Sequence, residues 1–236
     1  MPNPYFRFKQ FTIYQDRCAM KVTTDACLFG AWVAQHLPAA AETVLDVGAG
    51  TGLLTLMIAQ AGNRSIDAIE LQETDHVQAA ANIAQTAWHA SIRLIQGDVL
   101  AHVFDRKYDA IVSNPPFYEH DLKGGQRNRN IAHHNEGLLL SDLLDFIRGQ
   151  LAEEGTFFLL LPAKRHTELI RYLETMGLHC NSCCYVQQTE KHAPFRILVS
   201  GAFRKSACRE ERIVIRERNE YTPEFKALLS PYYLHL

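Results

Sequence analysis

Hydrophobic and polar positions follow two rhythms along this chain, and together they predict strands and helices in alternation. Short apolar runs and two-residue alternation predict buried strands, while longer segments of helical composition predict the helices between them. The seven expected strands are residues 43–48, 65–71, 91–96, 108–113, 156–161, 178–187 and 195–203. The expected helices are residues 25–36, 52–61, 73–88, 138–150, 164–176 and 223–229. Strands that alternate with helices favour a largely parallel sheet with helices on both faces.

The last two long strands, 178–187 and 195–203, are expected to close the sheet as an antiparallel hairpin, and residues 212–216 could add a short strand. The chain of 236 residues shows no linker and no internal repeat, so we expect a single domain over 1–236. A hydrophobic share of 47% and a charged share of 21% exclude a disordered chain, a coiled coil and a collagen-like repeat.

Two observations bear on the location of the protein. No stretch reaches the ~18–20 uninterrupted apolar residues of a membrane span. The N-terminal residues MPNPYFRFKQ lack the apolar core of a signal peptide. We therefore expect a cytoplasmic protein with no membrane partner.

The net charge of −2 argues against a globally basic protein that binds nucleic acid through its whole surface. The two halves differ slightly, because residues 1–118 hold 8 Lys/Arg and 11 Asp/Glu while residues 119–236 hold 16 and 15. Any contact with nucleic acid must therefore come from local patches.

The six cysteines do not suggest a disulfide framework in a chain of this length. Cys180 and Cys183 form a CxxC pair, but a zinc site would need a second pair of ligands at suitable spacing, and none is evident. We expect structural cysteines and no metal site.

A glycine-rich segment, residues 46–52 (DVGAGTG), lies where the first core strand leads into a helix. It could be a tight turn, a dinucleotide site or an S-adenosylmethionine site. The dinucleotide pattern GxGxxG would need a third glycine at position 53, which is Leu53. Asp46 would repel a pyrophosphate and attract the ammonium of a methionine moiety. The segment therefore predicts a methyl-donor site that includes Asp46, Gly48, Ala49, Gly50 and Gly52.

Two more acids follow the next two strands. Glu70, with Leu71 beside it, ends the second strand and is placed to accept hydrogen bonds from ribose hydroxyls. Asp98 follows the third strand and is placed to accept from an adenine amino group, with Val99 supplying an amide and apolar contact. Each acid alone is more often a helix cap or a solvated charge. Acids at three successive strand ends favour a ligand across the switch point of the strand order.

The sequence NPPF at residues 114–117 directly follows the fourth strand. Its two prolines could simply terminate a strand, but that role needs neither the asparagine nor the aromatic residue. The segment resembles the (D/N/S)PP(Y/F) motif of amino-group methyltransferases. The resemblance implies that the Asn114 side chain and the Pro115 carbonyl accept hydrogen bonds from the target NH2, and that Phe117 stacks on the planar substrate, with Pro116 stiffening the loop. Asn114 also counts among the donor-binding residues.

The chemistry of such a site is coherent. Two acceptors on the N–H bonds of a conjugated amine localise its lone pair toward the sulfonium methyl for direct in-line transfer. Alignment of the two reactants supplies much of the acceleration. Base stacking on Phe117 would contribute ~1–3 kcal/mol.

Further motifs resemble those of the bacterial tRNA(Val) (adenine-37-N6)-methyltransferases. They are Lys9-Gln10-Phe11, residues 16–22 (DRCAMKV), Thr24-Asp25, Gly30-Ala31-Trp32, residues 213–216 (IVIR) and residues 232–234 (YYL). With NPPF, the resemblance covers nearly the whole chain. One departure is Phe117, where this family more often has Tyr; stacking survives the change, but a phenolic hydrogen bond does not.

The resemblance implies a Rossmann-like, class I S-adenosylmethionine-dependent methyltransferase with a seven-stranded, mostly parallel α/β sheet. Residues 1–36 would cover substrate and donor, and residues 37–236 would form the core with a short C-terminal extension. It also implies S-adenosyl-L-methionine as cofactor, a monomer, and N6 of adenine 37 in the anticodon stem-loop of valine tRNA as target. The alternatives are a methyltransferase for guanine-N2 of ribosomal RNA or for protein glutamine, and an RNA-binding protein of this fold without catalysis. The intact acids and Asn114 argue against the last.

Two weaker sets of candidates complete the site. Thr24 with Asp25 predicts a helix cap, and the resemblance also brings Thr24 near the donor, where Lys21 could add charge. The expected RNA-binding residues are Arg7, Lys9, Arg17, Lys123, Arg127 and Arg129. The last three lie in the loop 119–136 beside NPPF, which is long enough to suggest function. The basic run 203–218 is either an RNA face or a mixed solvated face.

Overall fold

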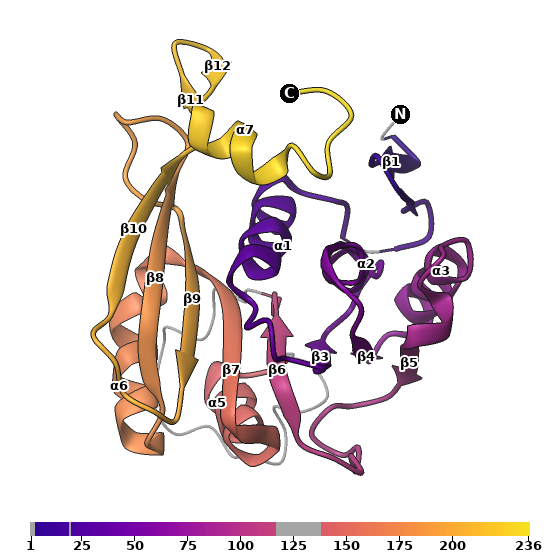
Figure 1. Ribbon diagram of the computed structural model, residues 1–236, viewed down its shortest axis with the longest axis vertical. Helices are drawn as coiled ribbons and strands as arrows, with labels where there is room; N and C mark the ends of the chain where they lie inside the picture. The colour runs from indigo at the N-terminus through magenta and orange to yellow at the C-terminus, as the bar shows by residue number, and fades with distance from the viewer. Residues whose placement is uncertain (1–2, 19, 117–137) are drawn as a thin grey trace.

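The computed structural model describes residues 3–18, 20–116 and 138–236, and its central feature is an eight-stranded sheet (Figure 1). The strand order is β10-β8-β9-β7-β6-β3-β4-β5. The strands are β3 Thr43–Val47, β4 Ser65–Glu70, β5 Ile92–Gln96, β6 Tyr108–Ser113, β7 Leu151–Pro162, β8 His179–Gln187, β9 Arg196–Ala202 and β10 Arg209–Val214. Within this sheet only β9 runs against its neighbours. The predicted mostly parallel sheet with a closing antiparallel hairpin is confirmed.

The expected count of seven strands is wrong, because β10 pairs in parallel with β8 as an eighth strand, from Arg209 beside Ser182 to Val214 beside Gln187. Its sequence REERIV carries four charged residues, and only Ile213 in it is buried. The apolar pattern of this segment is therefore too short to mark a strand clearly. A charged edge strand also discourages pairing with another chain.

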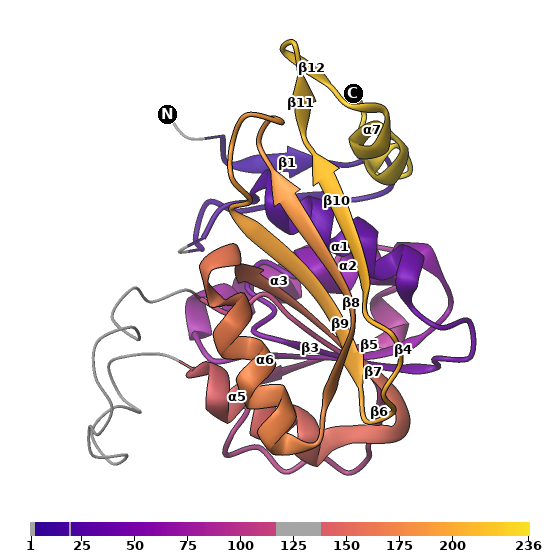
Figure 2. The same cartoon turned by 90° about the vertical axis from the view of Figure 1, so that its left-hand side faces the viewer.

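Helices cover both faces of the sheet (Figures 1 and 2). On one face lie α1 Thr24–His36, α2 Leu53–Ala61, α3 Glu73–Ala84 and α7 Pro223–Leu229. On the other lie α5 Leu140–Gln150 and α6 His166–Met176. Trp32, Met57 and Phe158 lie in the first core, and Leu143 and Leu169 in the second. Short elements complete the described chain: β1 Tyr5–Arg7, β2 Thr12–Tyr14, η1 His89–Ser91, η3 Ala163–Arg165, β11 Arg216–Glu217 and β12 Glu220–Tyr221.

Three local expectations differ from the structure. Helix α1 is capped by Thr23, whose hydroxyl accepts from the Ala26 N–H at 3.4 Å, and not by Thr24 and Asp25. Helix α3 ends at Ala84, four residues earlier than predicted. Strand β7 begins at Leu151, five residues before the predicted start at residue 156, and its pairing with β6 is irregular in between.

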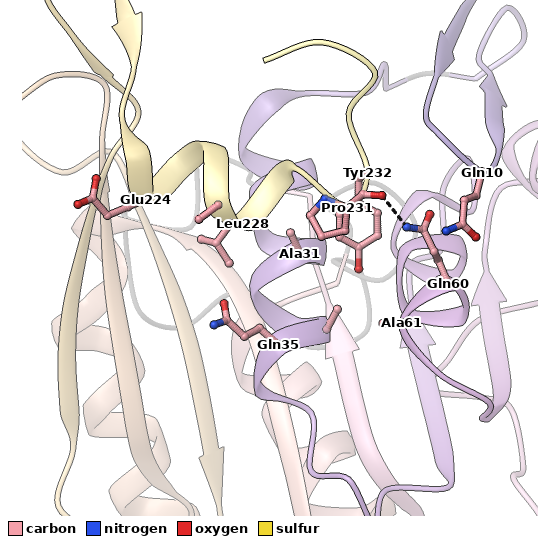
Figure 3. Close-up of a pocket in the computed structure, with 11 residues that line it drawn as sticks. Gln10, Ala31, Gln35, Gln60, Ala61, Glu224, Leu228, Pro231 and Tyr232 are labelled. Atoms are coloured by element: carbon pink, nitrogen blue, oxygen red, sulfur yellow. Dashed lines mark hydrogen bonds between the residues drawn. The ribbon is translucent and has the colours of Figure 1, made fainter.

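Helices α1, α2 and α7 border a cavity of about 700 Å³ on the outer side of the first layer (Figure 3). Its polar lining includes Gln35 and Gln60, and the Gln60 amide donates to the Pro231 carbonyl at 2.9 Å. None of the described residues in the predicted donor or catalytic sets lines it. Elsewhere, no helix in the described ranges is long and apolar enough to cross a membrane.

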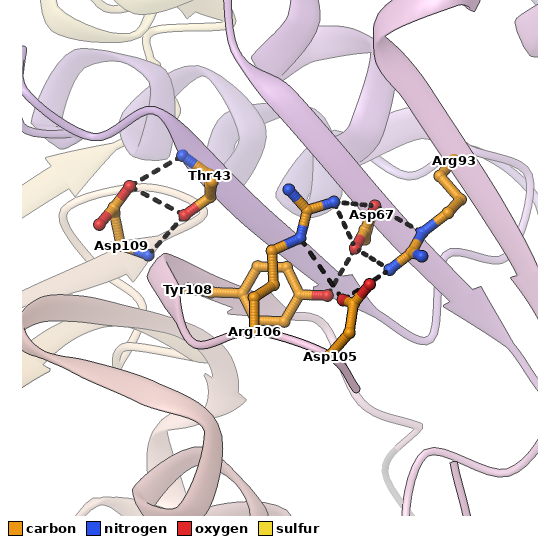
Figure 4. A network of polar contacts seen from close by, with 7 residues as sticks. All are labelled: Thr43, Asp67, Arg93, Asp105, Arg106, Tyr108 and Asp109. Carbon is orange, nitrogen blue, oxygen red and sulfur yellow. Dashed lines mark hydrogen bonds and ion pairs between the residues drawn. The ribbon is translucent and has the colours of Figure 1, made fainter. Parts of the chain in front are cut away.

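A buried polar network ties the parallel strands together on the amino-terminal side of the sheet (Figure 4). Asp67 of β4 is 1% exposed and accepts from Arg93 at 2.6 Å, from the Tyr108 hydroxyl at 2.5 Å and from Arg106 at 3.2 Å. Burial alone would raise the pKa of Asp67, but the hydrogen bonds from Arg93 and Tyr108 and the positive charges outweigh it and lower the pKa. Asp109 likewise accepts two backbone N–H groups at the start of β3. The strands are thus held in register away from the edge where their carboxyl ends meet.

Candidate active site

The carboxyl ends of β3, β4, β5 and β6 meet at one edge of the sheet. The chain leaves β3 toward β4 and β5 and then returns to β6 on the other side of β3. The strand order therefore switches between β3 and β6, where parallel sheets bind ligands. Asp46, Glu70, Asp98 and Asn114 all lie at or directly after these strand ends, so the structure brings them to one edge.

The glycine loop exposes its backbone toward open space. Gly48 has φ +77° and Gly50 has φ +54°, which is the left-handed region that favours glycine. A Cβ atom added at either position would meet nothing within 4 Å. The loop is anchored from behind, since the Gly48 and Ala49 N–H groups both donate to the Ile69 carbonyl at 3.0 and 3.1 Å. A ligand can therefore approach the backbone closely.

Asp46 is fully buried behind this loop. Its Oδ2 accepts from the Thr55 hydroxyl at 2.6 Å, and Thr55 lies in the first turn of α2. Its Oδ1 is buried and has no hydrogen-bond partner among the described residues. Burial raises the pKa of Asp46 to about 6, although the Thr55 hydrogen bonds pull in the opposite direction. A buried acceptor without a partner is costly, and a cationic donor from a ligand would satisfy it.

Glu70 fixes the glycine loop directly, a role that sequence patterns did not reveal. One carboxylate oxygen accepts from the Gly50 N–H and the other from the Gln72 N–H, both at 2.8 Å. Each oxygen keeps a further lone pair, so acceptor capacity remains for a ribose. The neighbouring Leu71 is 55% exposed.

Asp98 and Val99 follow β5 at the same edge. Asp98 is exposed, and its Oδ1 accepts from the Leu100 N–H at 2.9 Å, which is the local turn bond typical of an Asx residue. Val99 is buried. The Asp98 side chain is thus oriented by its own turn, and the neighbouring Val99 packs into the core.

Asn114 follows β6 immediately, next to the glycine loop in the strand order. Its Oδ1 is buried and lacks a hydrogen-bond partner within the described part of the chain. The adjoining strand end is fixed, because the Ser113 hydroxyl donates to the Val47 carbonyl of β3 at 2.8 Å. Pro115 is buried and Pro116 is exposed, while Phe117 lies outside the described residues. The edge thus holds two buried acceptors, on Asp46 and Asn114, that call for donors.

Residues 3–18 and 20–22, here called the N-terminal strap, are joined to the glycine loop through one side chain. Asn82 of α3 is 0% exposed; its Oδ1 accepts from the Tyr14 N–H, and its Nδ2 donates to the carbonyls of Tyr14 and Thr51, all at 2.9 Å. Thr51 belongs to the glycine loop. Sequence patterns missed Asn82, since a single Asn in a helix rich in alanine and glutamine carries no distinctive signal.

The weaker candidates lie around this strap. Lys21 donates to the backbone carbonyl of Gln15. The side-chain oxygen of Gln15 accepts from the Val22 N–H at 2.7 Å, so both contacts hold the strap together. Thr24 is exposed in the first turn of α1. The neighbouring Asp25 forms an ion pair with Arg196 at 2.7 Å. A donor contact from Lys21 or Thr24 stays a prediction.

The predicted RNA-binding residues fall into two groups. Arg7 and Arg17 are exposed, and the Arg17 backbone N–H donates to Gln78 of α3 at 3.2 Å, beside the strap. The Lys9 ammonium donates to the Ser230 carbonyl at 2.6 Å and so joins the strap to the C-terminal region. The remaining three, Lys123, Arg127 and Arg129, lie outside the described residues, as does the whole loop 119–136.

The basic run 203–218 is divided between the two ends of the sheet. Arg204 and Lys205 follow β9, whose end pairs with the start of β8 at the amino-terminal side. Arg216 and Arg218 follow β10, at the carboxyl-terminal side. The run is therefore not one continuous surface, and only its last arginines lie on the side of the candidate site.

Comparisons with known proteins agree with this geometry. The profile of the methyltransferase small domain family matches residues 30–191. Full-length relatives include proteins of Bacteroides thetaiotaomicron (36% identical over 239 residues), Parabacteroides distasonis (37% over 240) and Dyadobacter fermentans (38% over 238). The alignments cover 100%, 100% and 98% of both chains, and each relative is named tRNA1(Val) (adenine(37)-N6)-methyltransferase.

Solved structures share the fold at low sequence identity. A predicted O-methyltransferase from Agrobacterium tumefaciens superposes with a TM-score of 0.65 at 17% identity, covering 88% of this chain and 96% of its own. The glycopeptide N-methyltransferase MtfA complexed with S-adenosyl-L-methionine gives a TM-score of 0.57 at 16% identity, covering 76% and 87%. The expected class I methyltransferase fold is confirmed.

Proposed function

The chain belongs to the family of tRNA1(Val) (adenine(37)-N6)-methyltransferases, and we propose that it transfers a methyl group from S-adenosyl-L-methionine to the exocyclic N6 of adenine 37 in the anticodon stem-loop of valine tRNA. The family expected from the sequence motifs is confirmed by relatives that match the chain from end to end. The observation that carries the proposal is the pair of buried acceptors on Asp46 and Asn114, which lie on either side of the switch point.

The residues at the edge fit the methyl donor. The unpartnered Oδ1 of Asp46 would accept from the donor's ammonium, and the open backbone at Gly48 and Gly50 leaves room for the methionine chain. Glu70 would accept from the ribose hydroxyls with its remaining lone pairs, and Asp98 would accept from the adenine amino group above Val99. When bound, S-adenosyl-L-methionine supplies an electrophilic methyl group on a sulfonium.

Asn114 would hold the target amine. Its buried Oδ1 and the Pro115 carbonyl are two acceptors in a stiff loop, and together they would fix both N–H bonds of the amine. This orientation directs the nitrogen lone pair, and no covalent intermediate on the protein is needed. Phe117 would stack on the adenine, and RNA contacts from Arg7, Lys9, Arg17, Lys123, Arg127 and Arg129 would supply the salt-dependent part of binding. We further propose that the single domain acts as a monomer in the cytoplasm.

The decisive experiment is methyl transfer to transcribed valine tRNA, with the product nucleoside identified by mass spectrometry. We expect N6-methyladenosine at position 37. Asn114→Ala should abolish transfer and leave donor affinity, measured by calorimetry, largely intact, because Asp46, Glu70 and the glycine loop would keep their donor contacts. Methylated guanine as the product, or an unmethylated tRNA beside methylation of a protein glutamine in a parallel assay, would replace the substrate class. Activity of the variant within a few-fold of wild type would overturn the role of Asn114.

A further inference from the structure

Two thiols lie together on the amino-terminal side of the sheet, far along the strands from the candidate active site. The Sγ atoms of Cys180, at the start of β8, and Cys208, directly before β10, are 3.6 Å apart. The two strands pair in parallel, with Arg209 opposite Ser182, so the backbone brings these cysteines together on neighbouring strands at the edge of the sheet. The CxxC motif suggested Cys180 with Cys183, whereas the structure pairs Cys180 with a residue 28 positions away.

The pairing is held by contacts that involve neither sulfur. The side chain of Asn181 donates to the Arg204 carbonyl at 3.1 Å and accepts from the Ser206 N–H at 3.2 Å. Both groups lie in the loop between β9 and β10, so this single amide fixes the loop against β8 just before Cys208. The two thiols therefore stay close, joined by a weak S–H···S hydrogen bond and by no covalent bond.

Exposure distinguishes this pair from the other cysteines. Cys208 is exposed and Cys180 is half-buried, whereas Cys18, Cys27, Cys183 and Cys184 are buried. Burial raises the pKa of Cys27, Cys183 and Cys184 to about 12, and burial together with the neighbouring Cys208 also raises the pKa of Cys180. Exposure, and not acidity, therefore makes Cys208 the thiol that an oxidant reaches first. Cys183 is the nearest rival partner, but it is only 1% exposed. Within the described ranges, no group of three or more His, Cys, Asp or Glu could hold a metal ion instead.

We propose that Cys180 and Cys208 form an oxidation site that peroxides convert into an intrachain disulfide. The Cys208 thiolate attacks one oxygen of a hydroperoxide, the O–O bond breaks, and the other oxygen leaves as water or an alcohol after taking up a proton. Cys208 is then a sulfenic acid. The Cys180 sulfur attacks this sulfur, the S–O bond breaks, and the oxygen leaves as water with the Cys180 proton. Two thiols are oxidised and one peroxide is reduced.

Formation of the bond needs only a small local movement. Disulfide sulfurs are about 2.0 Å apart, so the two Sγ atoms must approach by roughly 1.5 Å. Cys208 precedes an edge strand and can supply this movement. The cross-link would close a loop that includes β9 and would restrain the edge of the sheet, and it would leave the glycine loop and Asn114 untouched. We therefore expect a more stable protein with unchanged methyl transfer.

The test treats the full-length protein with a small excess of hydrogen peroxide, then alkylates the remaining thiols and maps peptides by mass spectrometry. We expect loss of two hydrogens, one peptide pair joined through Cys180 and Cys208, and a higher unfolding temperature that returns to the starting value with dithiothreitol. Cys183→Ser should behave as wild type. Cys208→Ser should form no disulfide, and Cys180→Ser should stop at a sulfenic acid that a dimedone probe captures.

Three outcomes would overturn the proposal: a cross-link to Cys183, a disulfide between two chains on a non-reducing gel, or free alkylation of Cys180 after Cys208 has been oxidised. None of these readouts depends on the methyltransferase activity. Failure of the proposed substrate and failure of this site are therefore distinguishable.

Discussion

Asn82 connects the N-terminal strap to the glycine loop, and Asn82→Ala should weaken both. The substitution removes three hydrogen bonds of 2.9 Å, two to the Tyr14 backbone and one to the Thr51 carbonyl. A net contribution of ~0.5–1.5 kcal/mol for each of the three bonds gives a loss of about 1.5–4.5 kcal/mol in the free energy of unfolding. The upper part of this range applies because the side chain is 0% exposed, so water cannot replace the lost partners without opening the strap.

Chemical denaturation in urea measures the total loss, and hydrogen exchange locates it. The Tyr14 amide should exchange faster in Asn82→Ala, because its acceptor is gone. Asn82→Asp keeps the shape and one acceptor but loses the two N–H donors, so it should be at least as destabilising. Gln85→Ala is a matched control, since Gln85 is exposed at the end of the same helix and its side chain donates to the Ala81 carbonyl of that helix.

Donor affinity should fall in the Asn82 variants, because Thr51 belongs to the loop that the donor would border. Calorimetry with S-adenosyl-L-methionine checks this second effect. Two results would refute this role of Asn82. One is a free energy of unfolding of Asn82→Ala within about 0.5 kcal/mol of wild type. The other is a Tyr14 amide that is as well protected from exchange in Asn82→Ala as in the control Gln85→Ala.

Three further predictions concern charged groups. Because the pKa of Asp46 is raised to about 6, the side chain becomes protonated as the pH falls through that value. Donor affinity, measured by calorimetry, should therefore be about tenfold weaker at pH 5 than at pH 8. Asp46→Asn should bind the donor weakly at both pH values. Asp67→Asn should destabilise the fold by about 1.5–3 kcal/mol in urea denaturation near neutral pH, because its partners Arg93 and Arg106 are 47% and 37% exposed and stay hydrated. The exposed Asp105→Asn should have a smaller effect. The pKa of Asp67 is lowered in the folded protein, so the ionised side chain stabilises the fold above its unfolded pKa, near 3.8, and this contribution is lost as the pH falls through the lower folded pKa. The free energy of unfolding of the wild type should therefore fall more on acidification than that of Asp67→Asn. An equal fall in both proteins would contradict this. Arg17→Gln should weaken tRNA binding and reduce the slope of affinity against salt by about one, while Arg204→Gln at the opposite end of the sheet should leave both unchanged in filter-binding titrations.

Much of the fold and the location of the site could be predicted from the sequence. Parallel strands end at a common edge, so residues that follow successive strands must gather there once the strand order is known. This rule correctly predicts Asp46, Glu70, Asp98 and Asn114 at one edge. The closing hairpin followed from two long apolar strands with a short connection.

The parts that could not be predicted depend on partners that are distant in sequence. Asn82 acquires its role from Tyr14 and Thr51, which lie 68 and 31 residues away. The cap of α1 differs from the prediction by one residue, because Thr23 and Thr24 are both competent and only the backbone path decides between them. Strand β10 is held by its pairing with β8 and not by its own apolar pattern.

Around β3, β4 and β6, the buried polar groups discussed above are hydrogen-bonded at the amino-terminal ends of the strands and partly unpaired at the carboxyl-terminal ends. This difference supports the assignment of the site. On the amino-terminal side, Asp67 and Asp109 each have several donors, which is the arrangement expected where stability alone matters. On the carboxyl-terminal side, Asp46 and Asn114 each keep a buried oxygen without a partner in the described chain, and the backbone at Gly48 is open. Other buried oxygens without a described partner lie on Gln60, Ser182 and Gln187, but none of these adjoins the glycine loop. Unpaired buried acceptors destabilise a folded protein, and those on Asp46 and Asn114 lie where a ligand could supply the missing donors. A cationic methyl donor and a target amine would satisfy one acceptor each.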